Sequence, residues 1–182
     1  MKSIQLFSRM ALFLALMILS AYIQITLPTP FMPMHITMQL FTAILCGFCL
    51  PDRYAFLCMF TYILVGLLGF PVFASGGGLQ YIMKPTFGFV LGFLACSTIC
   101  AIAYKRKSPI SLKEYFLVGL TGLISFYVVG NIYYYFSFPI LMNTRIPLWL
   151  SLTNGFLVSI IPDILICFLA CKVAKTLQVL IK

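Results

Sequence analysis

"YAFLCMFTYILVGLLGFPVFASGGGLQYIMKPTFGFVLGFLACSTICAIAY", residues 54–104, is the stretch that decides the fold. Its two ends, 54–69 and 84–104, are apolar almost throughout, and the segment between them is rich in glycine. A helix needs about 20 apolar residues to cross a bilayer, and backbone in lipid must satisfy its hydrogen bonds within the same segment. The stretch therefore predicts two membrane helices joined by a loop.

The rest of the chain repeats this pattern and indicates an integral membrane protein. Of its 182 residues, 63% are hydrophobic and 8% are charged, whereas a soluble domain carries about 25% charged residues. Six transmembrane helices are predicted, over residues 7–27, 37–51, 54–69, 84–104, 114–138 and 149–171. The second and third are short, which a tilt, a kink or a covering loop accommodates. No linker divides the chain, so we expect one all-α transmembrane domain over residues 1–182.

The basic residues predict how this bundle is oriented. The chain has twelve Lys and Arg against three Asp and Glu, and cytoplasmic loops of membrane proteins are enriched in Lys and Arg. With the N-terminus inside, ten of the twelve fall on the cytoplasmic side: Lys2, Arg9, Arg53, Lys105, Arg106, Lys107, Lys113, Lys172, Lys175 and Lys182. Lys84 and Arg145 fall outside. This bias predicts that both termini are cytoplasmic, and it removes the motivation for nucleic-acid binding.

The predicted outer loops are apolar and rich in Pro and Gly. The first contains "LPTPFMPMHIT" (27–37), and the third contains "FSFPILMNTRIPLW" (136–149). The second is "GFPVFASGGGLQYIMKPTFGF" (69–89), and its part 69–86 is called the glycine-rich loop below. Loops that only need solvation are usually polar. We therefore expect these loops to fold back onto the helices and to form a lid over a ligand.

The remaining residue types leave little for catalysis. The chain has one His and three carboxylates, and it lacks GxxxxGK[ST], HExxH and GxSxG motifs. Its seven cysteines lie in apolar segments without a His or carboxylate cluster, so neither a metal nor a cofactor is expected. Channels use rings of charge or carbonyls, and proton-coupled carriers use chains of ionisable groups. The sequence favours a non-enzymatic small-molecule binding protein that draws its energy from elsewhere.

Three polar side chains are the first candidates for ligand contacts. Asp163, in "SIIPDILICF", places a costly carboxylate within a span and is by default a functional hypothesis. The alternative is a paired Asp that ties helices together. Pro162 lacks a backbone donor and is expected to loosen the helix there. Thr37 and Gln39 share the edge between the first outer loop and the second span, where they either cap the helix or bind a polar ligand.

The glycine-rich loop supplies further candidates. Its small, aromatic and hydrogen-bonding residues are of the kinds that line small-molecule sites: Phe73, Gly76, Gly77, Gln80, Tyr81 and Thr86. The alternative is a flexible turn between helices. Lys84, the one lysine on the predicted outer side, either neutralises a ligand carboxylate or extends to the lipid headgroups.

Two pairs of small residues predict close helix contacts. "ALFLA" places Ala11 and Ala15 on one face of the first span, and "GFVLG" places Gly88 and Gly92 on one face of the fourth. Small residues at this spacing let a second helix approach closely. The partner of each face is either another helix of this chain or another protein.

Several motifs in order resemble one known family. "LPTPFMPMHITMQL", "CGFCL", "YILVGLLGFPVFASGGG" and "KPTFGFVLGF" are similar to segments of the BioY family, the biotin-specific binding components of energy-coupling factor (ECF) transporters. The match covers most of the chain and is strongest from 28 to 92. It is carried by Pro30, Pro33, Thr37, Gln39, Gly69, Pro71, Phe73, Gly77, Pro85, Thr86 and Gly88.

The resemblance implies a fold, a ligand and partners. Six helices would hold biotin near the outer face of a bacterial plasma membrane, under the loops between helices one and two and between helices three and four. Asp163 would accept from an N–H of the ureido ring, with Thr37, Gln39, Gln80 and Tyr81 as lesser contacts. Ala11 and Ala15 would dock the transmembrane coupling subunit. Two ATPase subunits would hydrolyse ATP, topple the binding component and drive import.

The sequence also departs from the family pattern. His35 stands where the family usually has Pro, Lys84 where it commonly has Gly, and Ile166 where a ligand-binding Lys typically follows the Asp. Our hypothesis is that Lys84 supplies the missing cation for biotin's carboxylate. Alternatives are loop backbone amides or Arg145. The incomplete motif leaves room for another small acid such as lipoate, and a stand-alone channel or a membrane scaffold is the alternative of a different class.

Overall fold

The fold is a bundle of α-helices with one small hairpin. The computed structural model describes residues 2–27, 34–104, 111–141, 147, 149, 153 and 159–180. Within these ranges it contains six α-helices: α1 (Lys2–Tyr22), α2 (Gln39–Cys49), α3 (Asp52–Leu67), α4 (Phe87–Tyr104), α5 (Leu112–Leu141) and α7 (Ile160–Leu180). The short strands β1 (Gln24–Leu27) and β2 (Met34–Thr37) pair with each other, and a 3-10 turn, η1 (Leu79–Met83), lies in the glycine-rich loop. The prediction of a six-helix bundle is confirmed.

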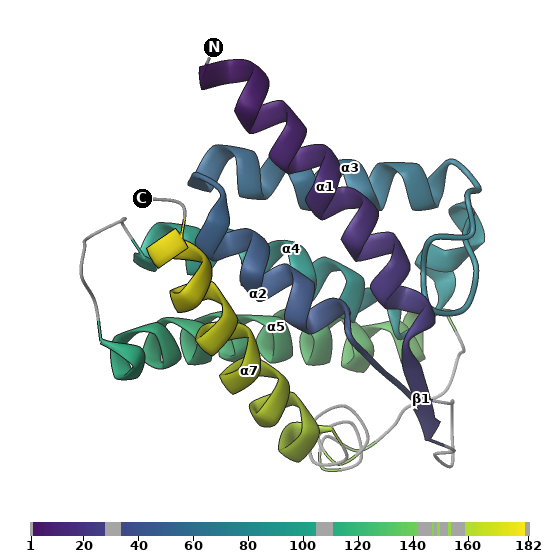
Figure 1. Cartoon of the computed structure of the whole chain (residues 1–182). Coiled ribbons are helices and arrows are strands. Elements are labelled where there is room, and N and C mark those ends of the chain that lie inside the picture. Colours follow the sequence, from purple (N-terminus) through teal and green to yellow (C-terminus); the bar gives the residue numbers. More distant parts are fainter. Residues whose placement is uncertain are drawn as a thin grey trace.

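Three of the described helices are long and apolar enough to cross a membrane. They cover Ile4–Tyr22, Phe87–Tyr104 and Leu112–Ile140. The predicted second and third spans are short, as expected: α2 has 11 residues and α3 has 16. Figure 1 shows α1 crossing the outside of the bundle over α3, while α2 lies inside it. Ten of the 11 residues of α2 are buried, so this helix is a core element.

The predicted end of the first span is wrong. The first span was expected to continue to residue 27, but α1 ends at Tyr22 and residues 24–27 form β1. β1 pairs antiparallel with β2, from Gln24 opposite Thr37 to Leu27 opposite Met34. Each strand satisfies backbone groups of the other, so this apolar segment does not need to be helical. The expectation that every predicted span is helical throughout is therefore incorrect here.

The last helix lies further along the chain than predicted. Within the described residues α7 covers Ile160–Leu180, whereas the prediction was 149–171, and most of 149–158 lies outside the described residues. Pro162 occurs in the first turn, where a helix has no N–H bond to lose. It therefore does not loosen the helix, and the next residue bonds normally from Asp163 N to the Ser159 carbonyl at 3.0 Å.

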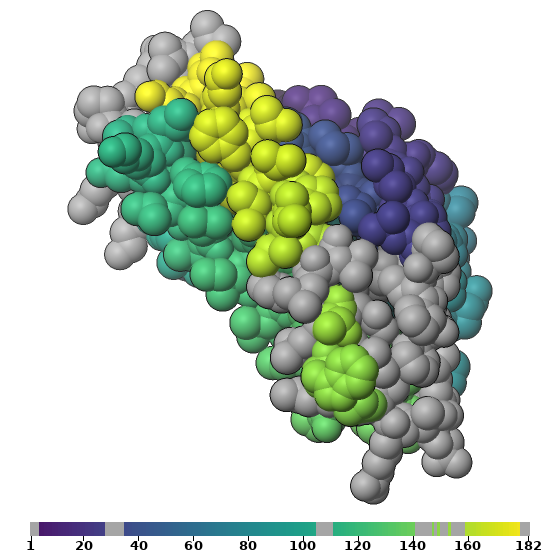
Figure 2. All heavy atoms as spheres, turned by 90° about the horizontal axis from the view of Figure 1, so that it is seen from below, coloured from purple at the N-terminus to yellow at the C-terminus, as the bar shows by residue number. Residues whose placement is uncertain are grey.

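Glycines allow the helices around the core to approach closely. A Cβ on Gly92 of α4 would lie 2.8 Å from Phe126 of α5, and one on Gly88 would collide with Tyr133. The small face of "GFVLG" is therefore an internal contact, which settles the alternative left open for this pair. On the other side α7 packs between α5 and α2 (Figure 2).

Candidate functional site

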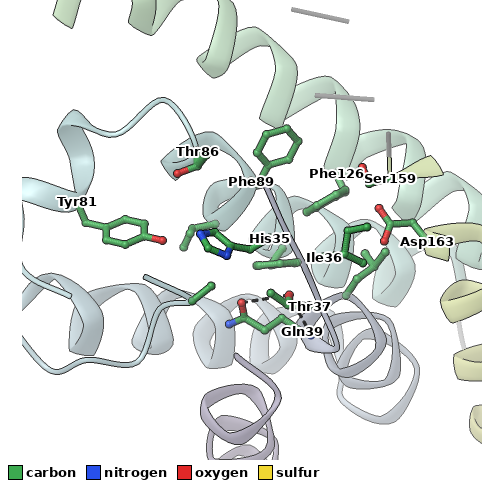
Figure 3. A pocket seen from close by; sticks show the side chains of 14 residues that line it. His35, Ile36, Thr37, Gln39, Tyr81, Thr86, Phe89, Phe126, Ser159 and Asp163 are labelled. Atoms are coloured by element: carbon green, nitrogen blue, oxygen red, sulfur yellow. Dashed lines mark hydrogen bonds between the residues drawn. The ribbon is translucent and has the colours of Figure 1, made fainter. Parts of the chain in front are cut away.

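A cavity lies at the end of the bundle where the hairpin, the glycine-rich loop and the start of α7 meet. Figure 3 shows it, lined by 14 residues from β2, α2, the loop, α4, α5 and α7: His35, Ile36, Thr37, Gln39, Leu40, Ala74, Tyr81, Thr86, Phe89, Val90, Phe93, Phe126, Ser159 and Asp163. Half of these residues are polar, but most of the wall surface is apolar. This mixture is typical of sites for small organic molecules.

Asp163 provides the negative end of the cavity. The side chain is 5% exposed, and its Oδ2 accepts a hydrogen bond from the Tyr127 hydroxyl of α5 at 2.5 Å. The same hydroxyl lies 3.2 Å from Ser159 Oγ. Within the described part of the chain no donor reaches Oδ1. Asp163 lies in the first turn of α7, at the positive end of the helix dipole, which favours a carboxylate. The group both links α5 to α7 and retains an acceptor for a ligand.

A buried polar network holds the opposite wall. Thr37 Oγ1 accepts a hydrogen bond from the backbone N–H of Gln39 at 3.3 Å and donates one to Gln39 Oε1 at 3.4 Å. Gln39 Nε2 donates to the Tyr62 hydroxyl at 2.5 Å, and that hydroxyl donates to the Val72 carbonyl at 2.9 Å. The network ties the start of α2 to α3 and to the glycine-rich loop. Thr37 therefore makes local bonds at the start of α2, and both residues also line the cavity.

The strand β2 directs His35 into the cavity. His35 stands opposite Thr26 in the hairpin, and its Nδ1 lies 2.9 Å from Thr26 Oγ1. In Figure 3 the imidazole lies between Tyr81 on one side and Asp163 on the other. Burial, and secondly the charge of nearby Lys84, lower the pKa of His35 below its usual 6.5. His35 is thus a hydrogen-bonding group that is mostly neutral at neutral pH.

The glycine-rich loop covers the cavity with aromatic rings. Tyr81 packs on Phe73 with ring centroids 4.6 Å apart, and Phe73 packs on Tyr62 at 5.5 Å. Lys84 Nζ donates to the Ser75 carbonyl at 3.2 Å and lies 4.7 Å from the centre of the Tyr81 ring. Lys84 is therefore held against the loop, next to a ring that lines the cavity.

Known proteins are similar to this chain in sequence and in fold. A model of the BioY family matches residues 1–182. The chain belongs to the BioY family. A probable biotin transporter BioY of Lysinibacillus sphaericus is 32% identical over 92% of this chain and 83% of its own length. The biotin transporter BioY of Thermotoga maritima is 35% identical over 65% of this chain and 68% of its own length.

A solved structure has the same arrangement of helices as this BioY chain. It is the crystal structure of the S-component for biotin from an ECF-type ABC transporter, with a TM-score of 0.82 and 22% identity over 97% of this chain and 92% of that one. At this identity the likeness concerns the fold, and it confirms the predicted S-component architecture. BioY relatives are named transporters, so the prediction that the chain is not an enzyme is confirmed as well.

Five residues predicted as ligand contacts come together in the BioY cavity. They are Thr37, Gln39, Tyr81, Thr86 and Asp163. The prediction therefore found residues from four separate segments that the fold brings to one cavity. Ile166, which stands where the family typically has Lys, packs against the core and does not line the cavity. Arg145, the alternative cation, lies outside the described residues.

The other predicted contacts lie beside the cavity and do not line it. Phe73 is the buried ring behind Tyr81, and Gln80 is exposed and donates to the Gly77 carbonyl at 3.1 Å. Gly76, with φ of 112°, closes a tight turn with Phe73. A Cβ on Gly77 would lie 3.0 Å from the Gly66 carbonyl and still nearer that of Phe70, so its close approach is to the loop's own backbone. Lys84 is not part of the lining and lies over the ring of Tyr81, which is.

Sequence reasoning missed three lining positions that matter for the chemistry. His35 was noted as a departure from the family but was not proposed as a ligand contact. Ser159 and Phe126 carry no local signal, because their position depends on how α5 and α7 pack. The seven cysteines are buried free thiols, and the described residues contain no group of three or more His, Cys, Asp or Glu placed to bind a metal.

Tyr62→Phe tests the wall network. Removing this hydroxyl leaves Gln39 Nε2 and the Val72 carbonyl without their partner, and each unsatisfied buried group costs about 1–3 kcal/mol. We expect the Tm in detergent to fall by several degrees, since about 1 kcal/mol shifts Tm by about 2–4 °C at this size. Tyr54→Phe is the matched control, because the described residues give the Tyr54 hydroxyl no hydrogen bond. An equal Tm for both variants would contradict the network.

Proposed function

We propose that this BioY chain binds biotin at the outer face of a bacterial plasma membrane and acts as the substrate-binding component of an ECF-type importer. The cavity carries the proposal. A carboxylate with a free acceptor lies at one end, apolar and aromatic side chains line the middle, and a cationic side chain, Lys84, lies beside Tyr81 at the other end. Biotin has the matching order of groups: a ureido ring with N–H donors, a sulfur-containing ring, and a chain that ends in a carboxylate.

The chemistry of the cavity orients the ligand. The ureido N–H groups donate to Asp163, where the Tyr127 hydroxyl already holds one carboxylate oxygen in place. Val90, Phe93 and Phe126 contact the sulfur-containing ring. The carboxylate then points toward the glycine-rich loop, where Lys84 exchanges the Ser75 carbonyl for the ligand. Thr37, Gln39, Tyr81 and Thr86 supply further polar contacts, while Phe73, Gly76, Gly77 and Gln80 act by shaping the loop.

Biotin is favoured over lipoate for a physical reason. Lipoate carries a carboxylate and a disulfide ring, but it has no N–H donor to offer Asp163. Binding it would enclose a carboxylate without its second partner, and such a buried charge is strongly destabilising. A ligand with N–H groups at one end and an acid at the other satisfies both ends.

Entry of the ligand requires the lid to move. The cavity encloses about 60 Å³ of free space, whereas small-molecule sites usually measure about 300–1,000 Å³. The hairpin and the glycine-rich loop are the elements that move away from the helices to open the cavity. They are connected by hydrogen bonds from Tyr22 Oη to the Pro71 carbonyl at 2.5 Å and from Gln24 Nε2 to the Ala74 carbonyl at 3.1 Å. These contacts make the two segments move together.

From the distribution of basic residues we infer that the cavity lies on the outer side. α4 begins at the cavity with Phe87 and ends at Tyr104, directly before Lys105, Arg106 and Lys107 in the sequence. α3 and α5 begin at the same basic end, with Arg53 and Lys113 in their first turns. Under the positive-inside rule this basic end is cytoplasmic. Ligand therefore enters from outside, as uptake requires.

The exposed face of α1 is the proposed docking surface for the transmembrane coupling subunit. Ala11 and Ala15 are both exposed, so neither packs against the described helices of this chain. Leu12 and Leu16, which flank them, are 58% and 40% exposed. Small residues between larger ones let a partner helix approach closely. Two ATPase subunits supply the energy, since this chain has no phosphate-binding loop of its own.

Thermal unfolding with a ligand series tests the proposed function. Biotin at about 100 times its Kd stabilises the folded state by about 2.7 kcal/mol, which corresponds to a rise in Tm of about 5–10 °C for a chain of this size. Desthiobiotin retains both ends and should give a similar shift, and lipoate should give little. No shift with biotin well above micromolar concentration would overturn the proposal, and ion conductance without partners would support a channel instead.

Ala15→Trp tests the docking surface. The bulky ring blocks close approach of a partner helix, so biotin uptake by cells with the full transporter should fall at least about tenfold. Biotin binding by the purified chain should stay unchanged, because Ala15 lies away from the cavity. Leu165→Trp, at an exposed position of α7, is the matched control and should keep normal uptake. Equal uptake by both variants would contradict this surface.

A further inference from the structure

The one histidine of the chain has an unusual position. His35 lies on β2 and lines the cavity. Thr26 engages its Nδ1 from the neighbouring strand, and no hydrogen bond to Nε2 occurs within the described residues. A hydroxyl can donate to the neutral ring or accept from the protonated one. The contact with Thr26 therefore holds the ring in place in both protonation states and leaves Nε2 for a ligand.

The charges around His35 are unbalanced. His35 and Tyr81 line the same cavity, and Lys84 Nζ lies 4.7 Å from the centre of the Tyr81 ring. The charge of Lys84 contributes to lowering the pKa of His35. The chain has only three side-chain carboxylates. Asp52 and Glu114 begin α3 and α5 at the opposite end of the bundle, and Asp163 is engaged by Tyr127 across the cavity. Among these three carboxylates, none is placed to pair with Lys84 and His35, so the end formed by these two residues favours an anion from outside the chain.

We propose that His35 is a second anchor for the ligand carboxylate and that it takes up a proton as the ligand binds, so that biotin capture is coupled to protonation of the lid. This inference rests on the proposed function. Neutral His35 with its proton on Nε2 donates one hydrogen bond to the carboxylate. Protonated His35 donates the same bond and adds a full positive charge, so that two cations, His35 and Lys84, face the ligand carboxylate.

The direction of the pH dependence follows from the pKa of His35. In the unliganded chain burial and Lys84 lower that pKa, so the ring is mostly neutral near pH 7. A carboxylate at hydrogen-bond distance raises the pKa of His35, because it favours the protonated ring. Between the two pKa values binding consumes a proton, and affinity rises as the pH falls, by up to about tenfold per unit. Below both values the dependence disappears, and an aliphatic carboxylate stays ionised down to about pH 4.3.

Isothermal titration of the purified chain tests this coupling. Biotin is titrated near pH 7 in two buffers with different ionisation enthalpies, and then across pH 5.5 to 8. We expect a positive fraction of a proton taken up per biotin and an affinity at least about fivefold higher at pH 6 than at pH 8. The alcohol analogue of biotin, which lacks the carboxylate, should bind without proton uptake. If the alcohol analogue takes up the same proton, or biotin takes up none, the proposal is overturned.

Two variants assign the proton to His35. His35→Gln keeps a donor but cannot titrate, so proton uptake and the pH dependence should both vanish, with folding checked by thermal unfolding. Lys84→Met should lower the affinity for biotin but keep the proton uptake. The pH range of that proton uptake should move upward, because the charge that repels a proton from His35 is gone. Unchanged uptake in His35→Gln would overturn the assignment. Absence of biotin binding at every pH is a separate result, since it would overturn the proposed function itself.

Discussion

A carboxylate inside an apolar helical bundle is stable only where neighbouring groups hold it, and this constraint organises the described structure. Asp163 is 5% exposed and accepts from Tyr127, which joins α5 to the first turn of α7. α5 is in turn packed tightly on α4 through Gly88 and Gly92. The position of one charged group thus depends on three helices, and the cavity lies in front of it. No described residue donates to the other carboxylate oxygen of Asp163, so a ligand N–H group can bond to it.

A second set of hydrogen bonds holds the hairpin and the glycine-rich loop, which cover the cavity. Thr37, Gln39 and Tyr62 connect the hairpin end, the core helix α2 and α3, and Tyr62 continues to the Val72 carbonyl of the glycine-rich loop. Tyr22 and Gln24 connect the end of α1 and β1 to the same loop. The proposed movement of the loop over the cavity would therefore act on the end of α1 through these hydrogen bonds. The proposed coupling surface, Ala11 and Ala15, is on this helix, so occupancy of the site and docking share one element.

Much of this arrangement could be predicted from sequence, for physical reasons. Apolar runs longer than a helical core segment predict spans, and a lone carboxylate within them predicts a site, which is how Asp163 was found. The hairpin was missed because "QITL" at 24–27 is only four residues long and directly follows an apolar helix, and its partner strand begins only at Met34. The position of α7 was missed because Lys172 and Lys175 suggested an end, although a helix continues easily through lysines at an interface.

The site residues likewise divide into those that could be predicted from the sequence and those that could not. Thr37, Gln39 and Thr86 lie at or next to helix starts, and Tyr81 is an aromatic residue of the loop, so all four were found from their type and place. Gly76 and Gly77 were expected to approach a ligand, but their conformations serve the loop's own turn, which depends on contacts with Gly66 and Phe70. His35 was seen only as a departure from a pattern, because its proposed role depends on how the fold places it in one cavity with Tyr81, beside Lys84.

The biotin affinity of Asp163→Asn, measured by isothermal titration, tests the central claim most directly. Asparagine has the same shape and still accepts from Tyr127, so the bundle should remain folded, but it loses the charge that the ureido N–H groups meet. A hydrogen bond to a charged group is worth about 1.5–3 kcal/mol, so the account predicts a loss of affinity of at least about tenfold. Unchanged affinity in a folded variant would contradict it.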